Sequence, residues 1–195
     1  LALLINFSIR FTPNELILRL SYLLSIGYAV PGLILAVGMV QLMVFLDANV
    51  FLGFEFVLTG SLFGLILAYI IKTYALANSS IESGYERLSH ALDDSAKLLG
   101  SSGFRMLKNV HIPLLKTSIL TSVLLVMSDV VKELPATLIL RPFNFETLAV
   151  STYTYASEER MLQAAAPAIA IVLIGLIPIV FLSKMIRSSR PVEEK

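Results

Sequence analysis

Three ionisable side chains lie close together in an otherwise apolar part of the chain. Asp129, Lys132 and Glu133 follow at i, i+3 and i+4, so they share one face of a helix. Ionisable groups at membrane depth usually pair with one another or line a polar path. One interpretation is therefore a polar lining for a translocation route, and the other is a structural Lys132–Glu133 or Lys132–Asp129 pair that holds the helix where Pro135 bends or breaks it. Arg141 is a further candidate for the lining; it could neutralise Glu133, but extension of its guanidinium to the membrane surface is the simpler expectation.

A second set of residues has a fixed spacing in the polar middle of the chain, which covers 78–111 and leads into the next apolar stretch. An acidic residue and two small residues are followed by a glycine and then by an apolar-x-apolar-Pro ending: Asp94, Ser95, Ala96, Gly100, Val110, Ile112 and Pro113. Ser83 precedes Glu86 at the spacing of a capping box, which predicts a helix start there, and apolar residues follow with a period near 3.6. By pattern alone, this segment is a surface amphipathic helix.

Other kinds of chemistry have little support in the sequence. There are no cysteines, so disulfides and thiolate metal sites are excluded. His90 and His111 have no third ligand at metal-binding spacing, and we expect both to be solvated or packed side chains. No glycine-rich phosphate loop occurs, so the chain is not expected to hydrolyse ATP. The net charge of +1 gives no reason to expect a nucleic-acid partner.

The elements that position these residues are long and apolar. Hydrophobic residues make up 56% of the chain and charged residues 15%, against about 25% charged in a soluble protein. A bilayer-spanning helix needs roughly 20 mainly apolar residues, and four such spans are predicted, at about 20–46, 56–77, 112–131 and 161–186. The second span requires Lys72 to extend its ammonium to the interface, and the third is the weakest because Lys116 and Asp129 interrupt it. We therefore predict an all-α fold, a polytopic transmembrane helical bundle in one domain over 1–195.

Basic residues lie mainly on one side of the predicted spans. The N-terminal flank, the middle loop 78–111 and the C-terminal tail contain most of the 15 Lys and Arg residues, whereas Lys132, Arg141 and Arg160 fall on the other side. Because positive residues accumulate in the cytoplasm, we expect the middle loop and the C-terminus to be cytoplasmic. Residues 1–9 are almost wholly apolar and read as the tail of an earlier spanning helix, so the chain is expected to be a fragment of a longer protein.

The spaced set in the middle loop resembles the signature loop of binding-protein-dependent ABC importer permeases. That family has an acidic and two small residues, followed at fixed distances by a glycine and an apolar-x-apolar-Pro ending. The departures are mild: Asp94 stands where glutamate is usual, and Ser95 stands where alanine is preferred. Stretches at Gly27–Gly32 and within 132–149 resemble the ferric-iron importer permeases, and this likeness extends over about 20–187, which corresponds to the second half of their fused chain.

This resemblance implies a MetI-like permease fold and a role as the membrane-spanning part of an ATP-driven importer in a bacterial inner membrane. The loop from Asp94 to Pro113 would dock on an ATP-binding-cassette ATPase subunit, with Ser95, Ala96 and Gly100 allowing close approach of the two backbones. The other implied partners are the lipid bilayer, a second permease half and a periplasmic substrate-binding protein that delivers ferric iron. ATP and Mg²⁺ would be bound by the ATPase subunit, and no cofactor by this chain.

Three alternatives stay open from the sequence. Thiamine, sulfate and polyamine permeases share the general plan, so the cargo could be another small solute. A secondary transporter would use Asp129 and Glu133 as proton or sodium carriers, and the docking loop would then have no purpose. A membrane scaffold that transports nothing is the third.

Overall fold

Helices joined by short turns make up the residues that the structure describes. The structure is a computed structural model, and it describes residues 1–12, 14–49 and 57–189. Within those ranges no strand is present, and the predicted all-α fold is confirmed. The helical elements are α1 (Ala2–Phe11), α2 (Glu15–Ile26), α3 (Gly32–Asn49), α4 (Leu62–Glu86), α5 (His90–Leu98), α6 (Gly103–Met106), the π-helical turn η1 (Leu107–His111), α7 (Ile112–Leu114), α8 (Lys116–Val131), α9 (Pro135–Leu140), α10 (Leu148–Ser157) and α11 (Met161–Ser189).

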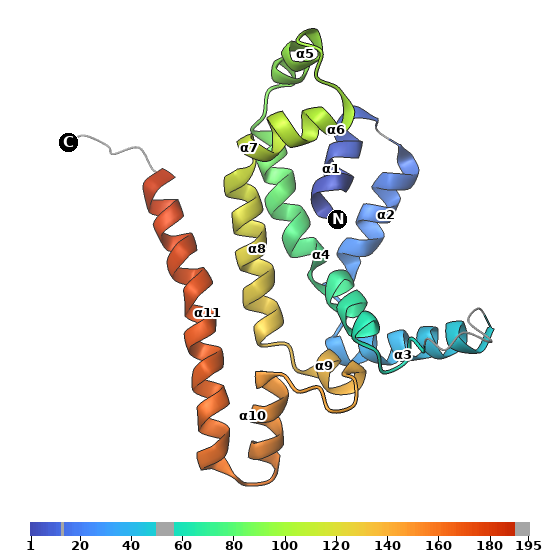
Figure 1. The fold of residues 1–195 in the computed structure, drawn as a ribbon, viewed down its shortest axis with the longest axis vertical. Helices are drawn as coiled ribbons and strands as arrows, with labels where there is room; N and C mark the ends of the chain where they lie inside the picture. Colours follow the sequence, from blue (N-terminus) through green and yellow to red (C-terminus); the bar gives the residue numbers. More distant parts are fainter. Residues whose placement is uncertain (13, 50–56, 190–195) are drawn as a thin grey trace.

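The centre of the molecule is the helix pair α4 and α8, which is the most extensively packed pair among the long helices (Figure 1). Helices α1 and α2 pack against α4, and α11 packs against both α8 and α10. Helices α5 and α6 lie at one end of the long axis, and the turn between α10 and α11 lies at the opposite end. The polar middle segment and the α10–α11 turn are thus separated by the length of the bundle.

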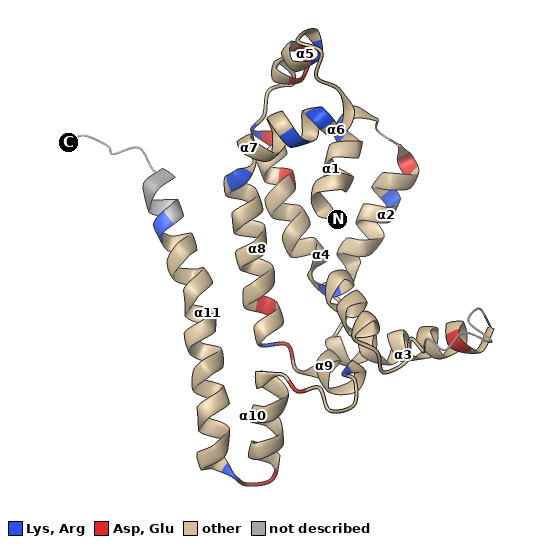
Figure 2. Ribbon diagram, viewed as in Figure 1, with Lys and Arg blue, Asp and Glu red and all other residues tan. Residues whose placement is uncertain are grey.

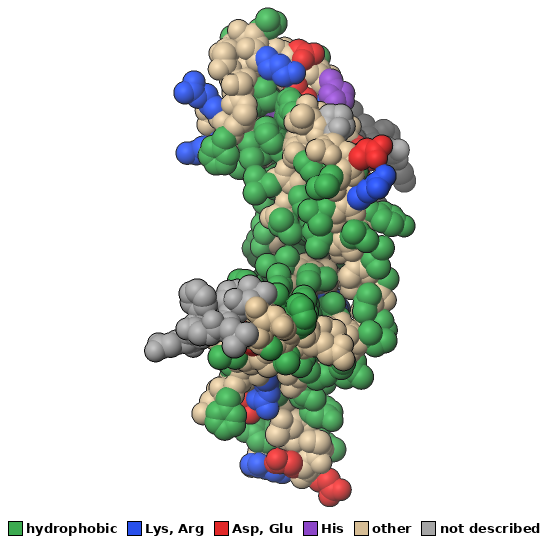
Figure 3. Space-filling model, turned by 90° about the vertical axis from the view of Figure 1, so that its right-hand side faces the viewer, with side chains coloured by type: hydrophobic (Ala, Val, Ile, Leu, Met, Phe, Trp, Pro, Cys, Tyr) green, Lys and Arg blue, Asp and Glu red, His purple; other side chains and the backbone are tan. Residues whose placement is uncertain are grey.

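Many charged side chains lie toward the two ends of the long axis (Figure 2), and apolar side chains dominate much of the surface between them (Figure 3). Helices α3, α4 and α11 are long and apolar enough to cross a bilayer. The helical segments Gly103–Leu114 and Lys116–Val131 make a fourth candidate, bent by 78°. Such an extensive apolar surface is stable where lipid or another subunit covers it, and the protein is a membrane protein.

The helix bounds differ from the sequence expectations in several places. The second span, expected at 56–77, is α4 from Leu62 to Glu86, and residue 56 lies outside the described residues. The span expected at 20–46 is not one continuous helix, because α2 ends at Ile26 and α3 begins only after Pro31 and runs across the long axis (Figure 1). Proline has no N–H for an interior helical bond, so it begins the new helix instead of continuing the old one. Helix α4 continues to Glu86, so the helix start predicted at Ser83 is wrong.

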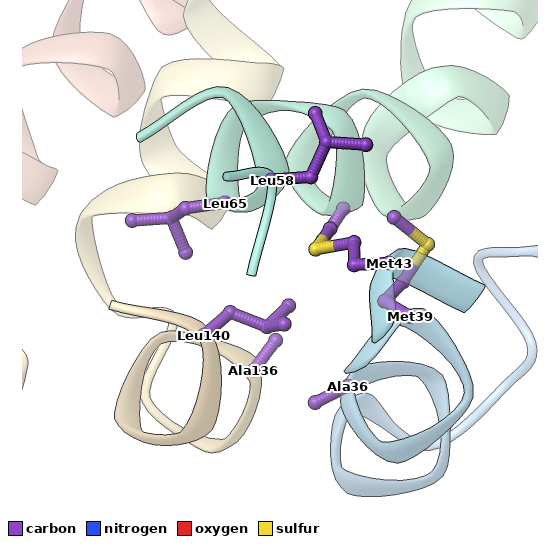
Figure 4. Packing of buried hydrophobic residues seen from close by; sticks show 8 residues of the cluster. Ala36, Met39, Met43, Leu58, Leu65, Ala136 and Leu140 are labelled. Atoms are coloured by element: carbon purple, nitrogen blue, oxygen red, sulfur yellow. The ribbon is translucent and has the colours of Figure 1, made fainter. Parts of the chain in front are cut away.

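A small apolar core joins α3, α4 and α9 (Figure 4). Its buried members in that view include Ala36, Met39, Met43, Leu58, Leu65, Ala136 and Leu140. A β-carbon at Gly64 would lie 2.5 Å from Cε of Met43, so the absence of a side chain there makes room for Met43. The core holds α9 against α3 and α4, and thereby fixes the turn at Glu133 that precedes α9.

A second apolar cluster joins α1, α4 and α8 nearer to α5. Its buried members are Ala2, Ile5, Tyr74, Ile81, Tyr85 and Leu115. Close to this cluster, a β-carbon at Gly84 would lie 2.5 Å from Oγ of Ser118 and 2.9 Å from a methyl carbon of Leu115. Helices α4 and α8 therefore approach closely where glycine leaves room, beside the segment that leads into α5.

Candidate functional site

The first half of the predicted docking loop lies on α5 and the turn after it. Asp94 and Ser95 are exposed on α5, whereas Ala96 is buried against the chain's own residues. Gly100 has a φ of +79° and open space where a side chain would begin. Glycine adopts that backbone conformation without steric cost. The small residue at Ala96 therefore serves packing within this chain, and close approach of a partner at Ser95 and Gly100 stays a prediction.

The second half of the loop forms the bend into α8. Val110 lies in η1, and Ile112 and Pro113 lie in α7. The helical segments before and after this point are inclined to one another by 78°. Single π-helical turns occur frequently at functional sites. The apolar-x-apolar-Pro ending thus marks the place where the middle segment changes direction to enter the bundle.

Three large apolar side chains of this loop point away from the rest of the chain. Leu98, Leu99 and Phe104 are 89%, 87% and 72% exposed, on the segment that lies at one end of the molecule (Figure 1). Arg105 and Lys108 belong to the same segment. A cluster of exposed apolar side chains rimmed by charged ones is typical of a surface that binds another protein. We call Leu98, Leu99 and Phe104 the apolar tip.

Beneath the apolar tip, side chains from four elements form a buried polar cluster. Asp93 of α5 accepts hydrogen bonds from Nε of Arg10 at 2.6 Å and from Nε2 of His111 at 3.0 Å. The other guanidinium nitrogens of Arg10 donate to the carbonyl oxygens of Tyr85 and Leu88 at 3.0 and 2.9 Å. The hydroxyl of Tyr85 lies 3.3 Å from Nδ1 of His111. We call Arg10, Tyr85, Asp93 and His111 the α5 anchor.

The polar side chains of the α5 anchor are almost wholly buried. The side chains of Arg10 and Asp93 are 7% and 4% exposed, and that of His111 is 1% exposed. A carboxylate only accepts hydrogen bonds, so the His111 ring presents an N–H to Asp93. Both histidines were expected to be solvated or packed, and this is confirmed: His111 is packed and His90 is exposed.

A second buried ion pair lies between α4 and the end of α8. Lys72 of α4 donates to Glu133, whose other carboxylate oxygen accepts the N–H of Ala136 at 3.1 Å. The two charged side chains are 15% and 9% exposed. A β-carbon at Gly32 would lie 2.9 Å from Nζ of Lys72 and 3.0 Å from Oε1 of Glu133, so the start of α3 covers the pair. Of the two structural pairings predicted for Lys132, the one with Glu133 is therefore not formed. The expectation that Lys72 extends its ammonium to the interface is wrong.

Lys132 pairs instead with Asp129, at 3.3 Å, as one of the two structural alternatives predicted. The Lys132 side chain is 65% exposed, and exposed pairs contribute little to stability. Arg141 donates to the carbonyl oxygen of Phe145 at 3.1 Å and lies 3.4 Å from a carboxylate oxygen of Glu146. It therefore belongs to the loop before α10, and it does not neutralise Glu133.

No metal site is evident in the parts of the chain that the structure describes. Within 1–12, 14–49 and 57–189, His, Asp and Glu side chains do not gather in a group of three or more that could hold a metal ion. The chemistry that these sites offer is ion pairing in buried surroundings and docking through exposed apolar side chains.

Comparison with known proteins bears directly on the spaced loop and on the bundle that carries it. Residues 1–188 match the family described as "binding-protein-dependent transport system inner membrane component". The chain belongs to this family. It is therefore an ABC permease domain, a transport subunit whose family members are not themselves enzymes, and the resemblance inferred from the loop spacing is confirmed.

Two curated permeases are similar to this chain. The "Fe(3+)-transport system permease protein FbpB 2" of Haemophilus influenzae is 27% identical over 166 residues, which cover 85% of this chain and 31% of the relative. The "putative 2-aminoethylphosphonate transport system permease protein PhnV" of Salmonella typhimurium is 28% identical over 120 residues, which cover 62% of this chain and 45% of the relative. The match thus spans less than half the length of either relative.

Sequence reasoning missed the partners of both buried ion pairs in the permease. It assigned Arg10 and Lys72 to the membrane flanks and singled out Asp94, whereas the neighbouring Asp93 is the buried carboxylate. The sequence contains no specific signal for the first pair, because an arginine at the end of an apolar stretch is usual at a cytoplasmic flank and a second acid directly before Asp94 is ordinary in a polar loop. Their pairing needed the fold, because Arg10 and Asp93 are 83 residues apart in sequence.

Proposed function

We propose that this permease forms part of the translocation path of an ATP-driven importer in a bacterial inner membrane, and that its cargo is ferric iron. A periplasmic substrate-binding protein delivers the cargo, and a second permease half completes the path. A separate ATP-binding-cassette subunit binds ATP and Mg²⁺ and performs the hydrolysis. The α5 end of the bundle and the C-terminus face the cytoplasm, and the α10–α11 turn faces the periplasm.

The observation that carries the proposal is the apolar tip on the family's spaced loop. Leu98, Leu99 and Phe104 are exposed at one end of the molecule on the segment that begins at Asp94. Apolar side chains at the centre of an interface contribute most when they fill pockets on the partner. The ATPase subunit supplies those pockets, and the basic residues of the segment form the rim.

The proposed path runs beside the Lys72–Glu133 pair. Lys72 lies within α4 beside the start of α3, and Glu133 lies between α8 and α9. Non-helical backbone at membrane depth is tolerated where protein or a water-filled cavity covers it. Asp129, Lys132 and Arg141 line a wider part of the same route; the Lys132 side chain is exposed, and those of Asp129 and Arg141 are partly buried.

The ferric-iron assignment is supported by the relative that covers most of this chain. The FbpB 2 protein is a Fe(3+)-transport permease by its name, and its match covers 85% of the permease. The PhnV match favours a second candidate, 2-aminoethylphosphonate, over 62% of the permease. Uptake of radioactive ferric iron and of radioactive 2-aminoethylphosphonate by the same cells distinguishes the two cargos.

The docking part of the proposal is tested by Leu98→Ser in the assembled transporter. Loss of one exposed leucine from a docking surface weakens ATPase binding, so co-purification of the ATPase subunit and cargo uptake fall together. Leu16→Ser is the matched control, because Leu16 is also exposed but lies on α2, outside the loop. If Leu98→Ser retains the ATPase and the parental uptake rate, the apolar tip is not the docking surface.

A further inference from the structure

The α5 anchor connects the exposed loop with the bundle through side chains that neither the docking surface nor the path uses. Helix α5 stands apart at the end of the molecule (Figure 1), and it makes few backbone contacts with other helices. Two of its residues, Asp93 and Ala96, are buried. Asp93 is therefore the polar attachment of α5 to the rest of the chain, and Lys97 adds a weaker one by lying 5.4 Å above the ring of Phe11.

Each hydrogen bond of Asp93 leads to a different part of the bundle. Arg10 belongs to α1, and its remaining donors hold the carbonyl oxygens of Tyr85 and Leu88 at the end of α4. His111 is the last residue of η1, and α7 connects it to the bend before α8, which we call the hinge of α8. One carboxylate thus ties α5 to α1, to the end of α4 and to the hinge of α8.

The surroundings of His111 leave it little freedom to absorb a displacement. Its ring lies 5.3 Å from the ring of Phe7 and 5.6 Å from that of Phe11, both on α1, and 5.4 Å from the ring of Tyr85 on α4. Closely packed interiors transmit strain because they contain few voids. When α5 shifts and displaces Asp93, the His111 ring therefore cannot rotate to compensate, and η1 moves with it.

Helices α4 and α8 extend from the anchor to the second buried ion pair. Tyr85 of α4 and His111 before α8 belong to the anchor, and Lys72 of α4 and Glu133 after α8 form the pair at the other end. The same two helices pack against each other along this course. A change in their inclination at the anchor is consequently a change in geometry at the Lys72–Glu133 pair.

We infer that Asp93 is a positioning residue for transport: through Arg10 and His111 it carries the movement of docked α5 into α1, the end of α4 and the hinge of α8. This inference rests on the proposed docking of α5 on an ATPase subunit. Asp93 does not touch that subunit or the cargo, because its side chain is buried under α5. Removal of its charge therefore uncouples hydrolysis from transport while assembly persists.

The test is Asp93→Asn in the complete transporter, purified with its ATPase subunit and reconstituted in liposomes with its binding protein and radioactive ferric iron. The quantity measured is ATP hydrolysed per iron imported, normalised to assembled transporter. We expect this ratio to rise at least about fivefold, the lower end of usual coupling between distant sites. A merely structural role lowers hydrolysis and uptake in proportion and leaves the ratio unchanged, which overturns the inference.

Two further variants keep the test decisive. His111→Leu leaves the Arg10–Asp93 pair intact and removes only the link to the hinge, so it raises the ratio even if Asp93→Asn fails to insert. Glu86→Gln, an exposed carboxylate at the end of α4, is the matched control and keeps the parental ratio. An unchanged ratio in His111→Leu refutes the anchor's role, whereas absence of the ATPase from the parental preparation refutes the proposed docking itself.

Discussion

Neutralising Glu133 tests whether the Lys72–Glu133 pair holds the bundle together or serves the path. In Glu133→Gln the amide oxygen still accepts the N–H of Ala136, so the change removes the charge and keeps the cap of α9. Removal of one partner from a buried ion pair costs roughly 3–5 kcal/mol. The side chains are 15% and 9% exposed, so we expect the lower end of that range, about 3 kcal/mol. At about 2–4 °C per kcal/mol for a chain of this size, the Tm of the purified permease falls by roughly 6–12 °C.

The double variant Lys72→Met with Glu133→Gln separates the two roles. Replacing a buried pair by uncharged side chains of similar volume is often neutral or stabilising, so the Tm returns to within a few degrees of the parental value. Uptake is then measured in the same preparation. If it also returns, the pair is structural; if it stays low, the charge of Glu133 acts on the cargo.

The matched control is Lys132→Met, which breaks the exposed pair with Asp129. Exposed pairs contribute about 0–1 kcal/mol, so its Tm shifts by no more than about 4 °C. A parental Tm for Glu133→Gln would refute the reasoning, because it would mean that the charge of Lys72 does not depend on Glu133 in the folded permease.

Three further outcomes are expected. A cysteine at Ser157 reacts with a membrane-impermeant thiol reagent in intact cells and one at Ser101 does not; the reverse pattern contradicts the proposed orientation. Gly84→Val introduces a β-carbon 2.5 Å from a serine hydroxyl of α8, and we expect it to destabilise the permease by about 1–3 kcal/mol. The control is Gly38→Val, which has nothing within 4 Å and changes the free energy of unfolding of the isolated permease by no more than about 1 kcal/mol. Equal Tm losses for the two variants would refute the close approach of α4 and α8. Gly100→Ala must adopt a φ near +79°, which costs about 1–2 kcal/mol, and an unchanged Tm would show that the turn adjusts freely.

The family and the fold class could be predicted because their signals are local. Charge-free stretches long enough to span a bilayer require only the order of residue types, and the loop from Asp94 to Pro113 is defined by spacing along one short segment. The pairing of Lys132 with Asp129 could be predicted as one alternative for the same reason, since helix geometry places residues i and i+3 together. These inferences needed no information about which helices are neighbours.

The partner of Glu133 could not be predicted because it lies 61 residues away, on α4. Lys72 stands at the end of an apolar stretch, where extension of the ammonium to the interface is the usual outcome. The structure differs because α3 begins after Pro31 and its first turn covers this point, which encloses the ammonium. A single helix through that region would have left Lys72 uncovered.

The start of the loop helix was missed for a different reason. Ser83 and Glu86 have the spacing of a capping box, so a helix start was predicted there. The side chain of Ser89 caps α5 by accepting the N–H of Ala91 at 3.2 Å. Ser83 lies inside α4, because Gly84 and Tyr85 are buried against α1 and α8 and extend that helix beyond the apolar stretch. Tertiary packing therefore overrode a local capping signal.

Both buried ion pairs occur where the backbone leaves a long helix, and this placement has a physical reason. Arg10 donates to the carbonyl oxygens of Tyr85 and Leu88 where α4 ends, and Glu133 accepts the N–H of Ala136 at the start of α9. Helix ends leave several backbone groups without partners, and inside a bundle water cannot satisfy them. A charged side chain that also has a charged partner supplies these bonds and keeps its own charge balanced. Apolar residues would fill the same space but leave the helix ends unsatisfied, so each ion pair fixes the direction in which its helix turns.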